Sequence, residues 1–161
     1  MENMNLIETR NRLIDEIFTL SNDEFNRNPD LYTWSIAQVC HHLLLVEKAF
    51  TYAIEMGLKK GQKAEQKNLN AIADRTMKLK APEIVIPDTK LFEVQQMIDL
   101  LNDSRNSFMA VLHSIEDESI LTERSAKHPL FDDLPLNQWV ELLYLHEDRH
   151  IEQIKEIKIE K

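Results

Sequence analysis

Apolar residues recur at intervals of three or four along four stretches of this chain, with polar residues between them. Such spacing places the apolar side chains on one face of a helix, so it predicts four amphipathic helices. We expect these helices over about residues 3–21, 35–56 and 88–115, and from Pro135 through Ile157. A helix of about 20 residues is about 30 Å long, and four such helices can enclose the core of a bundle.

The second expected helix has clear signals at both ends. Ser35 can cap its first turn with Gln38 as the capping-box partner, and Trp34 and Val39 flank this cap as a hydrophobic staple. Gly57 is the expected end of the helix, because glycine commonly follows the last helical turn.

The connections between the expected helices indicate the topology. Residues 58–88 form a long crossover with one short helical turn near residues 69–77, and residues 118–133 form a second connection that contains His128-Pro129. The prediction is an all-α fold: a single domain over residues 1–161 that is a four-helix bundle with a long crossover between helices 2 and 3.

Composition narrows the classes of function. The chain has 161 residues and a formal net charge of −9, and this negative charge disfavours nucleic-acid binding. It has only two glycines, so it contains no Gly-rich phosphate loop. Its single cysteine cannot form an internal disulfide. The first residues do not resemble a signal peptide, and no apolar run approaches the length of a membrane span, about 20 residues. We therefore expect a soluble cytoplasmic protein that contacts neither nucleic acid nor membrane.

Two histidines lie on the apolar face of the fourth expected helix. His146 and His150 are four residues apart, so their side chains lie one above the other on the same face. A helical wheel places both rings, and also Glu147, inside the arc of apolar residues: Leu136, Trp139, Val140, Leu143, Ile154 and Ile157. Polar groups that are buried without partners destabilise a fold, and one metal ion would satisfy both imidazoles.

A third ligand must come from another helix, and His42 is the best candidate because it borders the apolar arc of the second helix. The adjacent His41 lies almost opposite the centre of that arc and is expected to face solvent. His113 is expected on the outside of the third helix and His128 in a loop. Cys40 lacks metal-ligand spacing and is expected to be a small buried hydrophobe.

Two other interpretations of these histidines compete with a three-histidine site. A histidine near a core is often only hydrogen-bonded there. His146 to His150 also matches the HEXXH motif of zinc proteases. We do not favour a protease, because the third ligand of such enzymes normally lies downstream and the chain ends at Lys161. Glu147 remains a candidate for a partner of a metal ligand or for a general base.

These motifs and their order resemble the DinB-like superfamily, in particular its YfiT-type, bacillithiol-transferase-like branch. The resemblance covers nearly the whole chain, and the following segments carry it: Trp34-Ser35-Ile36 with His42-Leu43; Ala73-Asp74-Arg75 and Lys80-Ala81-Pro82 with Pro87; and His128-Pro129 with Phe131, Leu136, Trp139, His146 through His150 and Gln153-Ile154.

The resemblance implies a four-helix bundle of up-down-down-up topology, often dimeric, in which three histidines hold a divalent metal, usually zinc or nickel. Carried onto this chain, the ligands are His42, His146 and His150, and the expected assembly is a homodimer. The best-understood activities of the family are thiol transfers that use bacillithiol, mycothiol or glutathione, and a related isomerisation.

The first functional hypothesis is a metal-dependent transferase that activates a low-molecular-weight thiol for attack on a small electrophile. Three neutral imidazoles leave the full charge on the metal, so a bound thiol is readily deprotonated and a bound water has a pKa near ~7. Glu147 would orient a ligand or relay a proton. The alternatives are a hydrolase that uses a metal-bound hydroxide, and a non-catalytic, stress-related metal- or ligand-binding protein.

Overall fold

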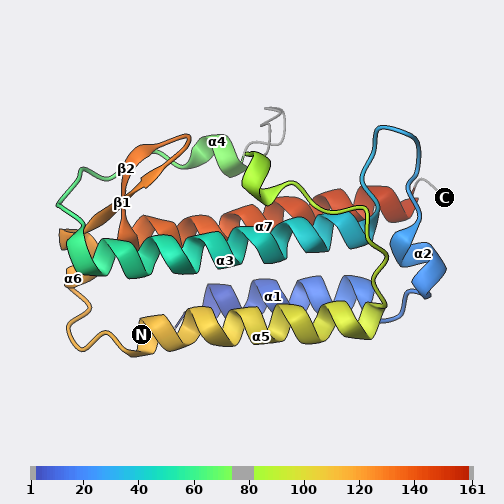
Figure 1. The fold of residues 1–161 in the computed structure, drawn as a ribbon, viewed down its shortest axis with the longest axis horizontal. Coiled ribbons are helices and arrows are strands. Elements are labelled where there is room, and N and C mark those ends of the chain that lie inside the picture. The colour runs from blue at the N-terminus through green and yellow to red at the C-terminus, as the bar shows by residue number, and fades with distance from the viewer. Residues whose placement is uncertain (1–2, 74–81, 160–161) are drawn as a thin grey trace.

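The computed structural model describes residues 3–73 and 82–159, and its main feature is a bundle of four long helices (Figure 1). These are α1 (Met4–Ile17), α3 (Ile36–Lys60), α5 (Val94–His113) and α7 (Leu136–Ile159). Shorter elements connect them: α2 (Asn22–Asn26), α4 (Asn70–Ala73), the 3₁₀ helix η1 (Glu83–Val85), α6 (Ile120–Glu123), β1 (Ser125–His128) and β2 (Asp132–Pro135). The prediction of a four-helix bundle is confirmed.

The long helices follow the up-down-down-up order. In Figure 1, α1 and α7 run in one direction, and α3 and α5 run in the opposite direction. α3 packs against both α5 and α7, while α1 packs against α7. Because α3 and α5 are parallel, the chain between them returns along the bundle, where α4 packs on α7 and η1 packs on α3. The predicted turn near residues 69–77 is observed as α4; residues 74–81, with Asp74-Arg75 and Lys80-Ala81, lie outside the described residues.

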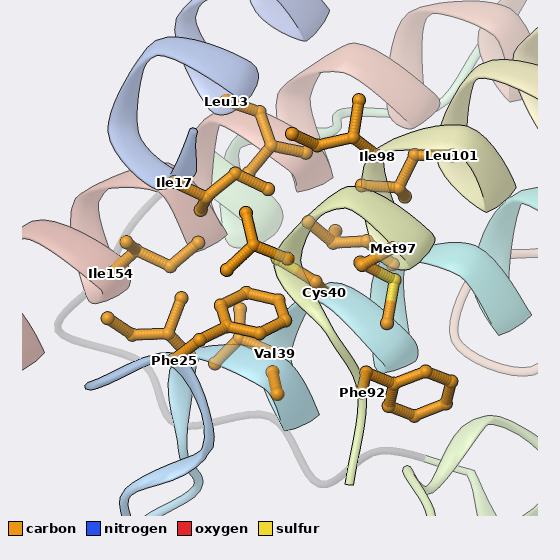
Figure 2. Close-up of a cluster of buried hydrophobic side chains, with 14 of the residues drawn as sticks. Leu13, Ile17, Phe25, Val39, Cys40, Phe92, Met97, Ile98, Leu101 and Ile154 are labelled. Atoms are coloured by element: carbon orange, nitrogen blue, oxygen red, sulfur yellow. The ribbon is translucent and has the colours of Figure 1, made fainter. Parts of the chain in front are cut away.

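Among the described residues, two apolar clusters form the core. Figure 2 shows the cluster beside α2, where Leu13 and Ile17 of α1, Met97 of α5 and Ile154 of α7 surround Cys40 of α3. Cys40 is fully buried, and burial raises the pKa of its thiol to about 12, so it is the small buried hydrophobe that we expected. The second cluster lies toward the strands and includes Phe50, Ile54, Phe108, Leu112, Leu136 and Trp139.

The connection before α7 contains a β-hairpin, which we did not predict. β1 pairs with β2 in antiparallel register, from Ser125 opposite Pro135 to His128 opposite Asp132. Neither four-residue strand alternates apolar and polar residues, since β1 reads Ser-Ala-Lys-His and β2 reads Asp-Asp-Leu-Pro, so the sequence carries no strand signal here. β1 packs directly against α3.

The predicted end of α3 at Gly57 is wrong, because the helix continues to Lys60. A Cβ atom at Gly57 would lie 2.6 Å from Leu136 Cδ2 and 3.1 Å from the carbonyl oxygen of Ser125. The glycine is therefore needed for the close approach of α3 to the hairpin and to the start of α7, rather than for ending a helix.

Two other predicted boundaries differ from the structure. The first helix ends at Ile17, and the separate helix α2 follows with its own capping box. α5 begins at Val94 rather than near residue 88, because Asn26 of α2 holds the preceding segment extended: its Oδ1 accepts a hydrogen bond from Phe92 N at 3.0 Å. Among the described residues, no helix has an apolar stretch long enough to span a bilayer.

Candidate metal centre

Three histidine rings converge between α3 and α7. His42 Nε2 lies 3.2 Å from His146 Nε2, which lies 3.1 Å from His150 Nε2. The three donor atoms all lie within 4.8 Å of one another. His42 is buried, whereas His146 and His150 are half-buried, so the cluster lies at the edge of the core.

The distances from His146 Nε2 to the other two Nε2 atoms suit a shared metal ion. Nitrogen ligands lie about 2.0–2.1 Å from zinc, so two of them on one ion are separated by about 2.9 Å at a right angle and about 3.4 Å at the tetrahedral angle. The two observed separations, 3.2 and 3.1 Å, fall inside this range. Three ligands of this kind leave at least one coordination position for a substrate atom.

Hydrogen bonds on the far side of two rings fix their tautomers. His42 Nδ1 lies 2.7 Å from the carbonyl oxygen of Val85, and a carbonyl can only accept, so Nδ1 carries the proton. His150 Nδ1 likewise lies 2.7 Å from Gln153 Oε1. In the neutral rings both Nε2 atoms therefore present lone pairs to the common centre, as metal ligands do.

His146 supplies the third nitrogen of the cluster. Its Nδ1 is buried and has no hydrogen-bond partner among the described residues, while its Nε2 faces the other two rings. A single proton on His146 cannot form good hydrogen bonds to two lone pairs at once, whereas one cation can bind all three nitrogens. The residues present therefore fit a divalent metal ion.

The electrostatic environment keeps the rings of His42 and His146 neutral. Burial lowers the pKa of His42, and the hydrogen bond to Val85 opposes this shift. Burial, together with the neighbouring rings of His150 and His42, lowers the pKa of His146 well below the usual value. A histidine must be unprotonated to bind a metal, so both shifts favour binding near neutral pH.

The other histidines are not in this cluster. His41, which we expected to face solvent, packs its ring against Phe92 with centroids 5.1 Å apart, and its Nδ1 accepts a hydrogen bond from Asp88 N. His41 therefore holds the segment before α5. His113 is exposed, as predicted.

His128 lies on β1 rather than in a loop. Its ring packs against Phe50, Phe131 and Trp139, with centroids 6.2, 5.2 and 5.0 Å away. Its Nδ1 accepts the backbone N–H of Leu130, so the proton of the neutral ring is on Nε2. Burial lowers the pKa of His128 to about 4.

Glu147 faces inward, as the helical wheel predicted, but its partners are arginines. Oε1 accepts hydrogen bonds from Arg10 Nε at 3.0 Å and Arg10 Nη2 at 2.8 Å, and Arg105 Nη2 lies 3.3 Å from both carboxylate oxygens. The expectation that Glu147 orients a metal ligand or relays a proton does not fit these contacts, because both oxygens are already bound by guanidinium groups.

Arg10, Glu47, Arg105 and Glu147 form a buried four-charge network with one member from each long helix. Arg105 Nε lies 2.5 Å from Glu47 Oε2, and Arg10 Nη2 lies 3.4 Å from the same oxygen. Two positive and two negative charges balance, so the network places no net charge in the core.

The sequence carries a signal for this network that the helical wheel of α7 alone does not reveal. In each long helix a charged or polar residue interrupts core positions spaced by three or four residues: Leu6-Arg10-Leu13-Ile17, Leu43-Glu47-Phe50-Ile54, Leu101-Arg105-Phe108-Leu112 and Leu143-Glu147-His150-Ile154. A charged residue in the middle of such a stripe must find a partner of opposite charge inside the bundle.

Comparison with known proteins identifies the family of this chain. The family model of the DinB superfamily matches residues 5–154. The uncharacterised protein YuaE of Bacillus subtilis (strain 168) is 31% identical over 153 residues, which are 94% of this chain and 93% of YuaE. The solved structure of YfiT from Bacillus subtilis, described as a probable metal-dependent hydrolase with an unusual four-helix bundle topology, superimposes with a TM-score of 0.68 at 19% identity and covers 96% of this chain and 82% of YfiT. This chain therefore belongs to the DinB superfamily.

Proposed function

We propose that His42, His146 and His150 bind one divalent metal ion, zinc or nickel, and that the protein is a metal-dependent transferase for a low-molecular-weight thiol. The observation that supports this most strongly is the convergence of three Nε2 atoms, two of them held as lone-pair donors by Val85 and Gln153. Three neutral donors and a half-buried position suit a reactive site better than a closed structural one.

When bound, a divalent ion supplies positive charge that lowers the pKa of a thiol or water in the remaining coordination position. The chain holds the three rings in place, and burial keeps His42 and His146 unprotonated. The ring of Trp34 packs on His42 with centroids 5.2 Å apart and provides an apolar wall beside the site. In the transfer, the thiol proton goes to solvent, sulfur bonds to an electrophilic carbon, and the bond from that carbon to its leaving group breaks.

A second candidate is metal-dependent hydrolysis. The description of YfiT as a probable metal-dependent hydrolase, together with its superposition over 96% of this chain, favours this alternative. The same three histidines would serve it, with water in place of the thiol as the nucleophile.

A paired activity screen distinguishes the two reactions. Metal-loaded protein is incubated with bacillithiol or glutathione and a bimane or chlorodinitrobenzene electrophile, and separately with a panel of esters, amides and lactones. We expect thiol transfer that a chelator and His42→Ala abolish and that His113→Ala, a control at an exposed histidine, leaves unchanged. Chelator-sensitive hydrolysis without thiol transfer would support the second candidate instead.

A metal that raises the melting temperature of the protein without any turnover in either screen would contradict both reactions. That result would leave the third possibility, a non-catalytic site in which the ion only links α3 to α7.

A further inference from the structure

The four-charge network lies beside the metal site along the chain. Glu147 follows His146 directly on α7, and Glu47 lies five residues after His42 on α3. The two arginines come from α1 and α5, which carry none of the three histidines. We propose that Arg10 and Arg105 are positioning residues for the metal centre: by binding Glu47 and Glu147 they fix the rotation of α3 and α7, and this inference rests on the proposed metal site.

The contacts tie the two histidine-bearing helices to the same pair of guanidinium groups. Each carboxylate contacts both arginines: Glu147 receives hydrogen bonds from Arg10 and Arg105, and Glu47 does so too. A change in the rotation of α7 relative to α3 would therefore break hydrogen bonds that are buried away from water.

The arginines are themselves anchored to the backbone. Arg10 Nη1 on α1 donates to the carbonyl oxygen of Leu101 on α5 at 2.7 Å, and Arg105 Nη1 on α5 donates to the carbonyl oxygen of Leu6 on α1, also at 2.7 Å. Because α1 and α5 hold each other in this way, the guanidinium groups form a fixed platform for the two carboxylates. The planar fork of arginine suits such a role, since it presents several donors in fixed directions.

A small rotation of a helix about its own axis changes the positions of its metal-binding nitrogens. A histidine nitrogen lies about 6 Å from its helix axis, so a rotation of about 10° moves it by about 1 Å. The distance between a metal ion and its ligand can deviate from the ideal value by only about 0.2 Å. A platform that fixes helix rotation within a few degrees is therefore what three ligands from two helices require.

The alternative is that the network only stabilises the fold. Stability alone cannot decide this, because replacing a complete buried ion pair with apolar side chains is often neutral or stabilising, whereas removing one partner is not. The charge-balanced variant Arg10→Met/Glu147→Met tests the positioning role, since it retains the Arg105–Glu47 pair. Its matched control is Arg12→Ala/Asp148→Ala, which removes an exposed ion pair of 2.6 Å between the same two helices.

Zinc affinity is measured by competition with a chromophoric chelator, the visible spectrum of the cobalt(II) form reports ligand geometry, and circular dichroism reports folding of the metal-free protein. We expect Arg10→Met/Glu147→Met to fold with a melting temperature close to wild type, to bind zinc about tenfold or more weakly, and to show an altered cobalt spectrum. The control variant should match wild type in all three measurements.

Unchanged zinc affinity and cobalt spectrum in the folded variant would overturn the positioning role. If the pair variant does not fold, Arg10→Lys decides, because it keeps the charge but loses the fork: weaker zinc binding supports the role, and wild-type binding refutes it. Wild-type protein that binds no zinc or cobalt would instead refute the proposed metal site, so the two failures are distinguishable.

Discussion

Among single residues, the partners that stand behind the histidines matter most for the candidate site. Val85 and Gln153 bind the Nδ1 atoms of His42 and His150 and thereby decide which nitrogen faces the centre. The positions of the histidines on their helices predicted that the three rings would meet. It could not predict Val85, because a backbone carbonyl carries no residue-type signal.

Gln153 offers a direct test of this arrangement. Gln153→Leu removes the acceptor for His150 Nδ1 and should weaken zinc binding about tenfold, whereas Gln153→Glu should preserve or strengthen it, because a carboxylate makes the ring a better ligand. Chelator competition measures both. Gln95→Leu, on the exposed face of α5, is the control. Equal affinities for the two Gln153 variants would contradict the assigned tautomer.

His128 should make stability depend on pH. Its pKa is about 4 in the folded protein, below the usual value for histidine, about 6.5, so between these values the unfolded chain binds more protons. The contribution of His128 to stability should therefore be complete above about pH 6.5 and be lost as the pH falls toward 4. Urea unfolding with chelator present, at about pH 7 and about pH 4.5, measures this loss.

The matched variant for that measurement is His128→Gln, which cannot titrate. The variant should lose less stability than wild type between the two pH values, because the remaining histidines contribute equally to both proteins. An identical loss in the two proteins would show that His128 is not held neutral by burial.

Among the elements, the long helices were predicted better than the segments between them. The Ser35 capping box forms as predicted: Ser35 Oγ accepts from Gln38 N, and Gln38 Oε1 accepts from Ser35 N. The hairpin and the start of α5 were not predicted because each is set by contacts with distant segments. The start of α5 depends on Asn26 of α2, and the hairpin depends on its packing against α3.

At Gly57, a contact with a distant segment should reverse the usual effect of replacing a helical glycine with alanine. Replacing glycine with alanine inside a helix normally stabilises it by about 1 kcal/mol. Here Gly57→Ala should destabilise the protein by about 1–3 kcal/mol, because the added Cβ overlaps Leu136 Cδ2. Urea denaturation measures the change, and the Leu136→Val background should reduce it, because the side chain there is smaller. A Gly57→Ala protein more stable than wild type would contradict the observed approach of α3 to α7.

In the molecule as a whole, the four-charge network lies between two apolar clusters and near the metal site. On α1, for example, Leu6 belongs to one cluster, Leu13 to the other, and Arg10 lies between them. From the sequence we recognised the polar interruption of α7 but not those of the other three helices. The charged residues in those helices are explained only by the topology, which brings the four charges into contact.

The expected homodimer remains a prediction about the whole molecule. α1 presents Met4 and Ile7 to solvent, 64% and 52% exposed, and apolar side chains in such positions suit an interface. Ile7→Glu should convert a dimer to a monomer without loss of helix content, as measured by light scattering coupled to size-exclusion chromatography. Leu130→Glu, an exposed position on the hairpin loop, is the control. A monomeric wild type would contradict the expectation.

Every functional proposal for this protein requires that His42, His146 and His150 together hold one divalent ion. Elemental analysis of protein purified without an affinity tag tests this requirement without assuming any reaction. We expect about one zinc or nickel ion per chain in wild type and in His41→Ala, and none in His42→Ala. Folded wild-type protein that contains no transition metal from any preparation, or a His42→Ala variant that retains the ion, would refute the three-histidine site.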